Sequence, residues 1–217
     1  PEIYDNTPSS ATTGDSFTFN ASVIDNVAVS NVYVEYWYDA GIHTNVSMSN
    51  IGGNYWEYTI TIAHTLDTLH YIISAVDSSG NWNNTGIKDV TISDNDKPEI
   101  TNVADYPDPQ RVNHYVNITC DVTDNIAVNI VKVNITYPDG SYINVTMNEG
   151  SYYYNASYNQ LGTYYYFIWA NDTSGNANKS STYTFVIHDI TKPEIYDNTP
   201  SSATTGDSFT FNASVID

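Results

Sequence analysis

The residues that could do chemistry in this chain are mostly aspartates. The 217 residues include 25 Asp plus Glu, of which 19 are Asp, against six Lys plus Arg. The formal net charge of −19 repels nucleic acid and anionic membrane surfaces and attracts cations, so nucleic-acid binding is excluded. Aspartate suits turns and calcium-binding loops better than helices. The composition therefore directs attention to cation binding.

Histidine and cysteine form no catalytic or zinc-binding pattern. Cys120 is the only cysteine, so no intrachain disulfide can form, and its place in an alternating strand predicts a small core residue. No nucleophile elbow and no phosphate-binding loop is present. We therefore expect a protein that is not an enzyme. The histidines are scattered, and no two lie at the short spacing of a zinc site: His43, His64, His70, His114 and His188.

A second group of residues could carry a covalent modification. The tripeptide Asn-x-Ser/Thr accepts N-linked glycans in secreted proteins. Asn20, Asn117 and Asn134 fall on the polar phase of predicted strands, where a bulky glycan meets no steric obstacle. We expect N-linked glycans at several of the ten sequons, which begin at Asn20, Asn45, Asn83, Asn117, Asn134, Asn144, Asn155, Asn171, Asn178 and Asn212.

Internal repetition organises the elements that position these residues. Residues 1–25 recur without change as residues 193–217, a period of 192 residues. Within one period the two halves are also alike, since VIDNVAV at residues 23–29 matches VTDNIAV at 122–128, and YIISAVDSSGN at 71–81 matches YFIWANDTSGN at 166–176. This predicts domains at residues 1–96 and 97–191 and the start of a third at 192–217.

Period-2 alternation of apolar and polar residues predicts strands throughout and no helix. In the first half the alternation places Phe17, Phe19, Ala21 and Val23 on the core face of one strand. About seven short strands in each half, with turn residues every 8 to 12 positions, is the pattern of an immunoglobulin-like sandwich. The predicted fold is all-β, a linear array of tandem immunoglobulin-like β-sandwich domains.

The repeated motifs carry a family resemblance. The run V-x-D-N-x-x-V, the later A-x-D-x-S-G-N and the linker D-x-x-K-P-E-I resemble the tandem immunoglobulin-like repeats of prokaryotic, particularly archaeal, surface-layer and surface-fibre proteins. The resemblance covers the whole chain. It implies an extracellular or cell-surface location and self-association with further repeats or neighbouring protomers.

The linker DNDKPE at residues 94–99 resembles the acidic linker between cadherin repeats, which in that family ligates calcium at the domain junction. In an immunoglobulin-like sandwich, the loops that contain Asp124 and Asp172 share the pole where the first strand begins, so both should meet this linker. Oxygen ligands from several segments are what Ca²⁺ requires. The expected ligands are Asp94, Asp96, Glu99, Asp124 and Asp172, with Asp189, Glu194 and Asp217 at the next junction and Asp25 and Asp77 at the equivalent pole of the first domain.

Two features of the next linker and the chain end qualify this expectation. Thr191 replaces the acid found at Asp96 in the first linker, so we expect weaker calcium binding there. The repeat at residues 193–217 would expose an apolar face unless the array continues or another protomer supplies the missing strands. We expect continuation. No apolar run approaches the length of a membrane span, so any membrane anchor would lie outside this sequence.

Taken together, these patterns favour a non-catalytic structural repeat of an extracellular, glycosylated fibre, stalk or surface layer, stiffened by calcium at its domain junctions. Two alternatives remain open at this point. The chain could be an adhesin or carbohydrate-binding region whose outward aromatic residues, including Trp37, Trp56 and Trp169, hold a ligand. It could also supply the spacer modules of a secreted enzyme.

Overall fold

The structure is a computed structural model that describes residues 1–217, and it contains strands and no helix. The predicted all-β fold class is confirmed: the strands form two sandwiches, β1 to β10 and β11 to β19, followed by a two-stranded ribbon. No helix of the chain is long and apolar enough to cross a membrane.

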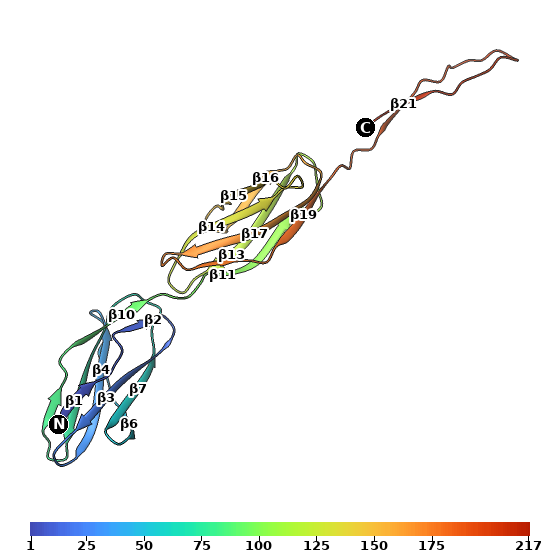
Figure 1. Cartoon of the computed structure of the whole chain (residues 1–217). Helices are drawn as coiled ribbons and strands as arrows, with labels where there is room; N and C mark the ends of the chain where they lie inside the picture. The colour runs from blue at the N-terminus through green and yellow to red at the C-terminus, as the bar shows by residue number, and fades with distance from the viewer. The chain divides into compact units, whose positions relative to one another are not determined.

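The first sandwich consists of two sheets, visible as two layers in Figure 1. One sheet has the strand order β1(Glu2–Asp5), β3(Ser16–Ile24), β7(Tyr55–Thr61), β6(Ser49–Gly52). The other has the order β2(Ser10–Thr12), β10(Lys88–Ser93), β8(Leu69–Asp77), β4(Val29–Tyr38), β5(Thr44–Ser47), with β9(Trp82–Asn84) paired to β8. The strand β2 runs parallel to β10, and the other pairs of this sandwich are antiparallel.

The core of the first sandwich follows the alternation in the sequence. On β3, the residues Phe17, Phe19, Ala21 and Val23 are at most 4 % exposed, as predicted. They pack against Val32 and Val34 of β4 and Leu69, Tyr71 and Ile73 of β8. The Tyr71 hydroxyl donates to Asp5 Oδ2 at 2.7 Å, which ties β8 to the end of β1. Burial of a phenol therefore comes with a hydrogen-bond partner.

The second sandwich repeats this plan. Its first sheet has the order β11(Glu99–Tyr106), β13(Tyr115–Thr123), β16(Tyr153–Ser157). Its second has the order β12(Gln110–Arg111), β19(Tyr183–His188), β17(Gly162–Asp172), β14(Val128–Thr136), β15(Tyr142–Thr146), with β18(Ala177–Lys179) on β17. The strand β12 is parallel to β19.

Aromatic residues fill one end of the second core. The rings of Tyr158, Tyr164 and Phe185 lie with centroids 4.8 to 4.9 Å apart, and all three side chains are almost fully buried. Cys120 is 3 % exposed, which confirms its prediction as a small core residue. The Tyr166 hydroxyl donates to Asp105 Oδ2 at 2.7 Å, the counterpart of the bond from Tyr71 to Asp5.

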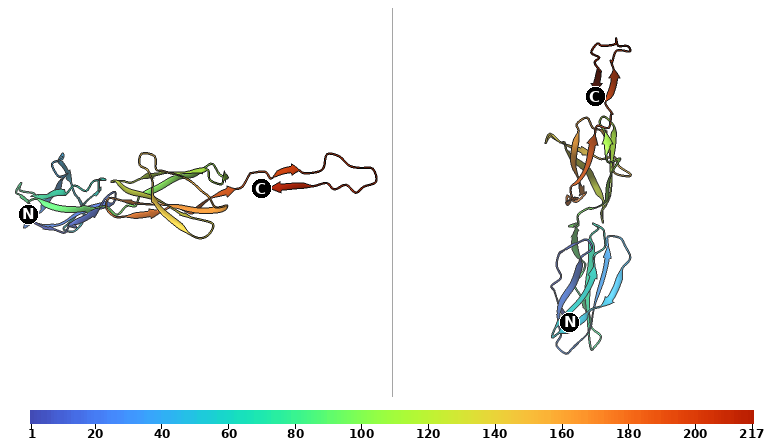
Figure 2. Two further views of the ribbon diagram at one scale, coloured as in Figure 1. Left: turned by 90° about the horizontal axis from the view of Figure 1, so that it is seen from above. Right: turned by 90° about the vertical axis from the view of Figure 1, so that its right-hand side faces the viewer.

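The final strands β20(Glu194–Asp197) and β21(Ala213–Ile216) pair only with each other, as the red ribbon in Figure 2. Apolar residues in and beside these strands are exposed, with Val215 at 62 % and Phe211, which precedes β21, at 84 %. The chain divides into two compact units, the first made of Pro1–Thr101, Asp121–Val131 and Trp169–Ser180. The predicted domain boundaries at residues 96 and 191 stay predictions.

Candidate metal centre

Three of the predicted calcium ligands lie together. Asp94 follows the end of β10, Asp124 follows β13, and Asp172 ends β17. A ligand oxygen from each carboxylate lies within 4.8 Å of the others, and all three residues belong to the first compact unit. Asp172 is completely buried, and the other two are half-buried. Three separate segments of the chain therefore place negative charge at one point.

Tight turns hold two of these carboxylates in place. Asp124 Oδ1 accepts hydrogen bonds from the backbone amides of Ile126 and Ala127, both at 3.0 Å. Both carboxylate oxygens of Asp172 accept hydrogen bonds from Asn176. The backbone amide of Asn176 donates to Oδ1 and its side-chain amide donates to Oδ2, each at 2.8 Å. Aspartate side chains commonly stabilise turns in this way. The turns fix where the carboxylates stand, and they supply only neutral donors.

The third carboxylate is held by a network of side chains. Asp94 Oδ1 accepts from the Thr13 hydroxyl at 3.1 Å and from the Asp96 amide at 3.1 Å. The Asn125 side-chain amide donates to Asp96 Oδ2 at 2.7 Å and to the Thr13 hydroxyl oxygen at 2.9 Å. Asp96 therefore lies beside the cluster of three carboxylates and not in it.

Hydrogen bonding keeps the Asp94 carboxylate ionised. Burial acts to raise its pKa, but the Asp96 amide and the nearby polar side chains of Ser174, Thr13 and Asn125 outweigh burial and leave the pKa below its ordinary value. A carboxylate stabilised by donors in this way stays charged at neutral pH. The cluster therefore retains negative charge, which attracts cations.

Three oxygens in this region are buried and have no hydrogen-bond partner: Asp94 Oδ2, Asp124 Oδ2 and Asn125 Oδ1. Leaving a buried acceptor unpaired costs about 1–3 kcal/mol, and more for a charged group. Oxygens of carboxylates and amide carbonyls are the ligands that Ca²⁺ takes. The residues present thus fit a calcium ion, with the amide of Asn125 as a potential ligand that the linker motif does not predict.

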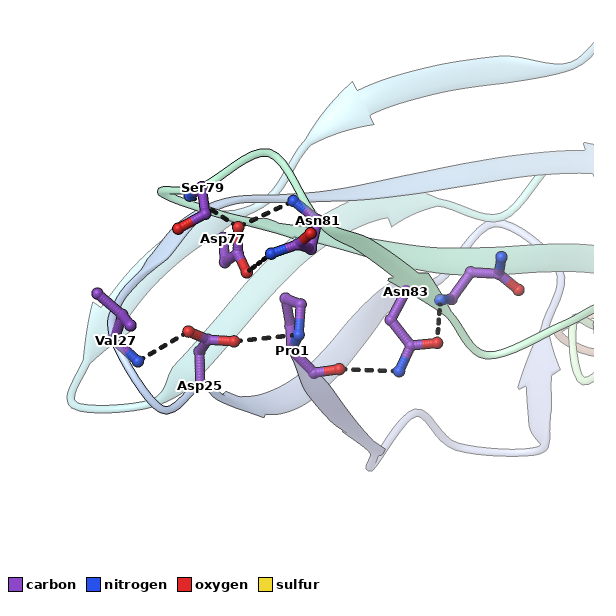
Figure 3. Close-up of polar contacts among 8 residues, drawn as sticks. Pro1, Asp25, Val27, Asp77, Ser79, Asn81 and Asn83 are labelled. Carbon is purple, nitrogen blue, oxygen red and sulfur yellow. Dashed lines mark hydrogen bonds and ion pairs between the residues drawn. The ribbon is translucent and has the colours of Figure 1, made fainter.

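The first sandwich has a related arrangement at the pole shown in Figure 3. Asp25 Oδ1 accepts from the Val27 amide at 2.9 Å, and Asp77 binds Asn81 and Ser79 as Asp172 binds Asn176. The amino group of Pro1 lies 3.1 Å from Asp25 Oδ2. The hydrogen bond from the Val27 amide does most to lower the pKa of Asp25. The hydrogen bond from the Asn81 side chain does most to lower the pKa of Asp77. Turn donors thus hold Asp25 and Asp77 as they hold Asp124 and Asp172.

The remaining predicted ligands are not assembled. Glu99 begins β11 and is exposed, and it does not join the three carboxylates. Asp189, Glu194 and Asp217 are also exposed and belong to no group of three or more potential metal ligands. Asp189 Oδ1 accepts from the Thr191 amide at 2.8 Å, which repeats the turn made by Asp94 and Asp96. Their role as ligands stays a prediction.

The sequons differ in their accessibility. Four of the asparagines are half-buried, namely Asn20, Asn117, Asn134 and Asn171, and six are exposed, namely Asn45, Asn83, Asn144, Asn155, Asn178 and Asn212. The Asn20 side-chain amide donates to Glu57 Oε1 at 2.6 Å, so this nitrogen is already engaged. Asn83 and Asn178 are exposed, but their side-chain amides also donate, to the backbone oxygens of Pro1 and Pro98, each at 2.8 Å. The structure thus ranks the other exposed sequons ahead of Asn20.

The expectation of outward tryptophans needs correction. Trp37 is only 7 % exposed because its ring stacks on His43, at a centroid distance of 4.0 Å, and lies beside His70. Trp56 packs against the core of the first sandwich. Trp37 is therefore closed to a ligand, and Trp56 and Trp169 are only partly exposed. Trp82, which the alternation did not single out, is 62 % exposed.

Comparison with known proteins yields structural likeness only. No protein-family model matches the chain, and no curated protein matches it. Solved structures that do match include the fibronectin(III)-like modules of Clostridium thermocellum CbhA, at 18% identity over 87% of this chain and 94% of that chain, with a TM-score of 0.35. The amphioxus IgVJ-C2 molecule matches at 13% identity over 82% and 99% of the two chains, with a TM-score of 0.45.

A further match is a tetra-tandem repeat in the extending region of a large adhesion protein. The identity is 19%, the match covers 98% of this chain and 55% of that chain, and the TM-score is 0.43. At these identities the likeness concerns the fold alone. The strand pairing of the chain itself identifies it as an all-β protein of tandem sandwich domains.

Proposed function

We propose that the chain is a non-catalytic structural repeat of an extracellular, glycosylated fibre, stalk or surface layer, and that calcium bound by Asp94, Asp124 and Asp172 stiffens it. The exact repeat of 25 residues after 192 positions, the two sandwiches and the ten sequons support this proposal. An array of like domains gains length with each repeat and needs no catalytic site.

The observation that carries the calcium proposal is the set of unpaired buried oxygens. Asp94 Oδ2 and Asp124 Oδ2 are inaccessible and have no donor, although their carboxylates lie within ligand distance of one another and of Asp172. Like charges at this separation repel, and the repulsion grows as water is excluded. A divalent cation converts that repulsion into ligation.

Calcium would act here as a structural link. Its ligands come from the segment after β10, the turn after β13 and the turn at the end of β17, so one ion would join three distant parts of the chain. Asn125 Oδ1, which is also buried and unpaired, is available as an additional neutral ligand. The bonds from Thr13 and the Asp96 amide would hold Asp94 Oδ1 while its second oxygen ligates the ion.

The test is calorimetric titration of the full chain with calcium, combined with thermal unfolding in calcium and in chelator. We expect one site in this region and a higher unfolding midpoint in calcium, because a ligand that binds only the folded state stabilises it. Asp124→Asn and Asp172→Asn should each weaken binding at least tenfold. Asp139→Asn is the matched control, since Asp139 lies outside this cluster and accepts hydrogen bonds from Ser141 and Gln160.

Equal unfolding midpoints in calcium and in chelator would show that the three aspartates serve only as turn residues. The fibre itself is tested separately, by electron microscopy of the native cell surface with antibodies against the chain. Regularly spaced labelling along filaments or a lattice would support the structural role. Labelling confined to a secreted enzyme complex would favour a spacer role.

A further inference from the structure

A hollow of about 410 Å³ lies on the outer side of the sheet that contains β4, β5, β8 and β9. It is lined by Tyr33, Asn45, Ser47, Ser74 and Trp82. None of these side chains is charged, although the chain as a whole carries a net charge of −19. Aromatic walls combined with a few neutral polar groups are typical of sites for small uncharged polar ligands.

The aromatic wall consists of Tyr33 and Trp82. Their rings stack with centroids 5.8 Å apart and an interplanar angle of 27°. Trp82 nevertheless remains 62 % exposed, because it lies on the short strand β9 that pairs only with β8. A large exposed indole held by a second ring marks a contact surface, since it costs free energy to leave such apolar area in water.

The same hollow contains both functional residues of a sequon, Asn45-Val46-Ser47. Strand alternation turns Val46 toward the core of the first sandwich, and Asn45 and Ser47 line the hollow. Ser47 pairs directly with Tyr33 across β4 and β5. A sugar attached to Asn45 would therefore leave the backbone beside the aromatic wall.

We propose that this hollow seats the first pyranose ring of an N-linked glycan carried by Asn45. A pyranose has an apolar C–H face that packs on an aromatic ring and hydroxyl groups that bond to side chains such as Ser47 and Ser74. The inference rests on the glycosylation in the proposed function and adds a specific seat for one glycan. The occupant is the chain's own glycan, because the acceptor asparagine is part of the lining.

A second hollow shows why Asn45 is the favoured site. About 590 Å³ in volume, it lies over β1, β3 and β7 and contains the sequon residues Asn20 and Ser22 between Tyr4 and Tyr55. There, however, the acceptor nitrogen of Asn20 donates to Glu57 at 2.6 Å. The sequon at Asn45 lies on an exposed strand and has the stacked aromatic pair beside it.

The second sandwich provides an internal control at Asn144, the counterpart of Asn45. Tyr33 pairs with Ser47, and the equivalent pair is Lys132 with Thr146. The position of Trp82, opposite Val76, is taken by Ala177, opposite Asn171. Asn144 is also exposed but lacks the stacked pair, and the one ring among the counterparts of the lining residues is Trp169, half-buried at the place of Ser74. A glycan on Asn144 therefore has no counterpart of Trp82 beside it, and its contacts should not depend on Trp82.

The test uses the full chain produced in a host that attaches N-linked glycans, grown with isotope-labelled N-acetylglucosamine and trimmed to one sugar per site. Protons above an aromatic face experience its ring current, so NMR should show upfield shifts for the sugar on Asn45 that depend on Trp82, whereas the shifts of the sugar on Asn144 should be the same with and without Trp82. Trp82→Ala should abolish the shift, and Trp82→Phe should retain part of it. Asn45→Gln assigns the signal.

A stability measurement provides the second readout. The single sugar on Asn45 should raise the unfolding midpoint of the first sandwich by about 2–4 °C, which corresponds to a fraction of 1 kcal/mol for a domain of this size. Any effect of the same sugar on Asn144 should be independent of Trp82. In the Trp82→Ala chain, the difference caused by the Asn45 sugar should disappear.

Three results would overturn the inference. Unchanged shifts of the Asn45 sugar in the Trp82→Ala chain would show that the aromatic wall is not used. Glycans at other sequons with none on Asn45 would refute the seat but leave the proposed glycosylated fibre standing, whereas no glycan anywhere would refute both. Saturable binding of free N-acetylglucosamine to the Asn45→Gln chain, followed by Trp82 fluorescence, would assign the hollow to an external saccharide instead.

Discussion

Residues 1–25 and 193–217 have the same sequence in two different surroundings. In the first copy, β3 lies between β1 and β7, and Phe19 is fully buried. In the second copy, β21 pairs only with β20, and the equivalent Phe211 is 84 % exposed. Each difference between the copies is therefore due to neighbouring strands and not to the residues themselves.

Local structure is nearly the same in the two copies. Glu2 pairs with Ile24, and Glu194 pairs with Ile216, in the same antiparallel register. The amide of Thr7 donates to Asp5 at 3.0 Å, and that of Thr199 donates to Asp197 at 2.9 Å. The turn chemistry therefore belongs to the local sequence.

The copies differ in strand length and in whether the segment equivalent to β2 forms a strand. The strand β3 spans nine residues, whereas β21 spans four. Residues 202–204, which repeat β2, form no strand, because β2 exists through its parallel pairing with β10. The short segments thus need a partner from the rest of the domain, as expected for isolated two-stranded pairs.

The largest expected difference between the copies concerns the buried phenylalanine. Phe19→Ala should destabilise the first sandwich by about 3–5 kcal/mol, since it leaves a cavity in a packed core. Phe211→Ala should change the free energy of unfolding by no more than about 0.5 kcal/mol, as at other exposed positions. Chemical denaturation followed by tryptophan fluorescence measures both. Similar losses at the two sites would mean that residues 193–217 are buried in solution.

The next difference concerns Asp5 and Asp197. Asp5→Asn weakens the acceptor for the buried Tyr71 hydroxyl, 2.7 Å away, and should cost about 1–2 kcal/mol, because hydrogen bonds to charged groups are stronger than neutral ones. Asp197→Asn removes no such partner and should cost less than about 0.5 kcal/mol. The same denaturation experiment decides. A smaller loss for Asp5→Asn than for Asp197→Asn would contradict the assigned role of Asp5.

The pH dependence of stability at alkaline pH should also distinguish the Asp5 site, through its partner Tyr71, from the Asp197 site. Burial, together with the hydrogen bond to Asp5, raises the pKa of Tyr71 above its ordinary value of 10.0. A raised pKa contributes stability that is fully present below the unfolded value and is lost as the pH rises through the folded value. The unfolding midpoint should therefore fall above about pH 10. Tyr71→Phe should make this fall less steep, and Asp197→Asn should not change it.

The smallest expected effect is on glycan occupancy. Asn20 and Asn212 begin identical sequons, but Asn20 is half-buried and bonded to Glu57, whereas Asn212 is exposed. In glycosylated chain, peptide mass spectrometry should show a higher occupied fraction at Asn212 than at Asn20. Glu57→Ala, which frees the side-chain amide of Asn20, should reduce the difference in glycan occupancy between Asn212 and Asn20. Equal occupancy in the unmodified chain would indicate that glycans are attached before folding.

Much of the fold could be predicted from the sequence, because alternation records which face of a strand meets the core. On this basis Phe17, Phe19 and Val23 are predicted to lie inside, and all three are buried. The short strands β9 and β18 were not predicted. Three residues carry too little pattern, and these strands exist through pairing with β8 and β17.

The candidate metal centre was predictable in part. The linker motif and the shared pole of the loops predict Asp94, Asp124 and Asp172 as ligands, and these residues do lie together. The network through Thr13 and Asn125 was not predicted, since Thr13 lies 81 positions from Asp94 and only folding brings them together. The one available signal was the recurrence of Asp-Asn at residues 25–26 and 124–125.

The parallel pairing of β2 with β10 has a mechanical consequence. The strand β2 lies near the N-terminal end of the first sandwich's sequence and β10 near its C-terminal end. Hydrogen bonds from the Thr91 amide to the Ser9 carbonyl and from the Thr13 amide to the Ser93 carbonyl, each 3.0 Å, extend the contact between them. Tension applied to the two ends pulls neighbouring parallel strands in opposite directions along their length. The hydrogen bonds between them are then loaded together in shear and cannot open one at a time. The second sandwich places β12 beside β19 in the same way, with two residue pairs in place of three, so under stretching force it should yield before the first.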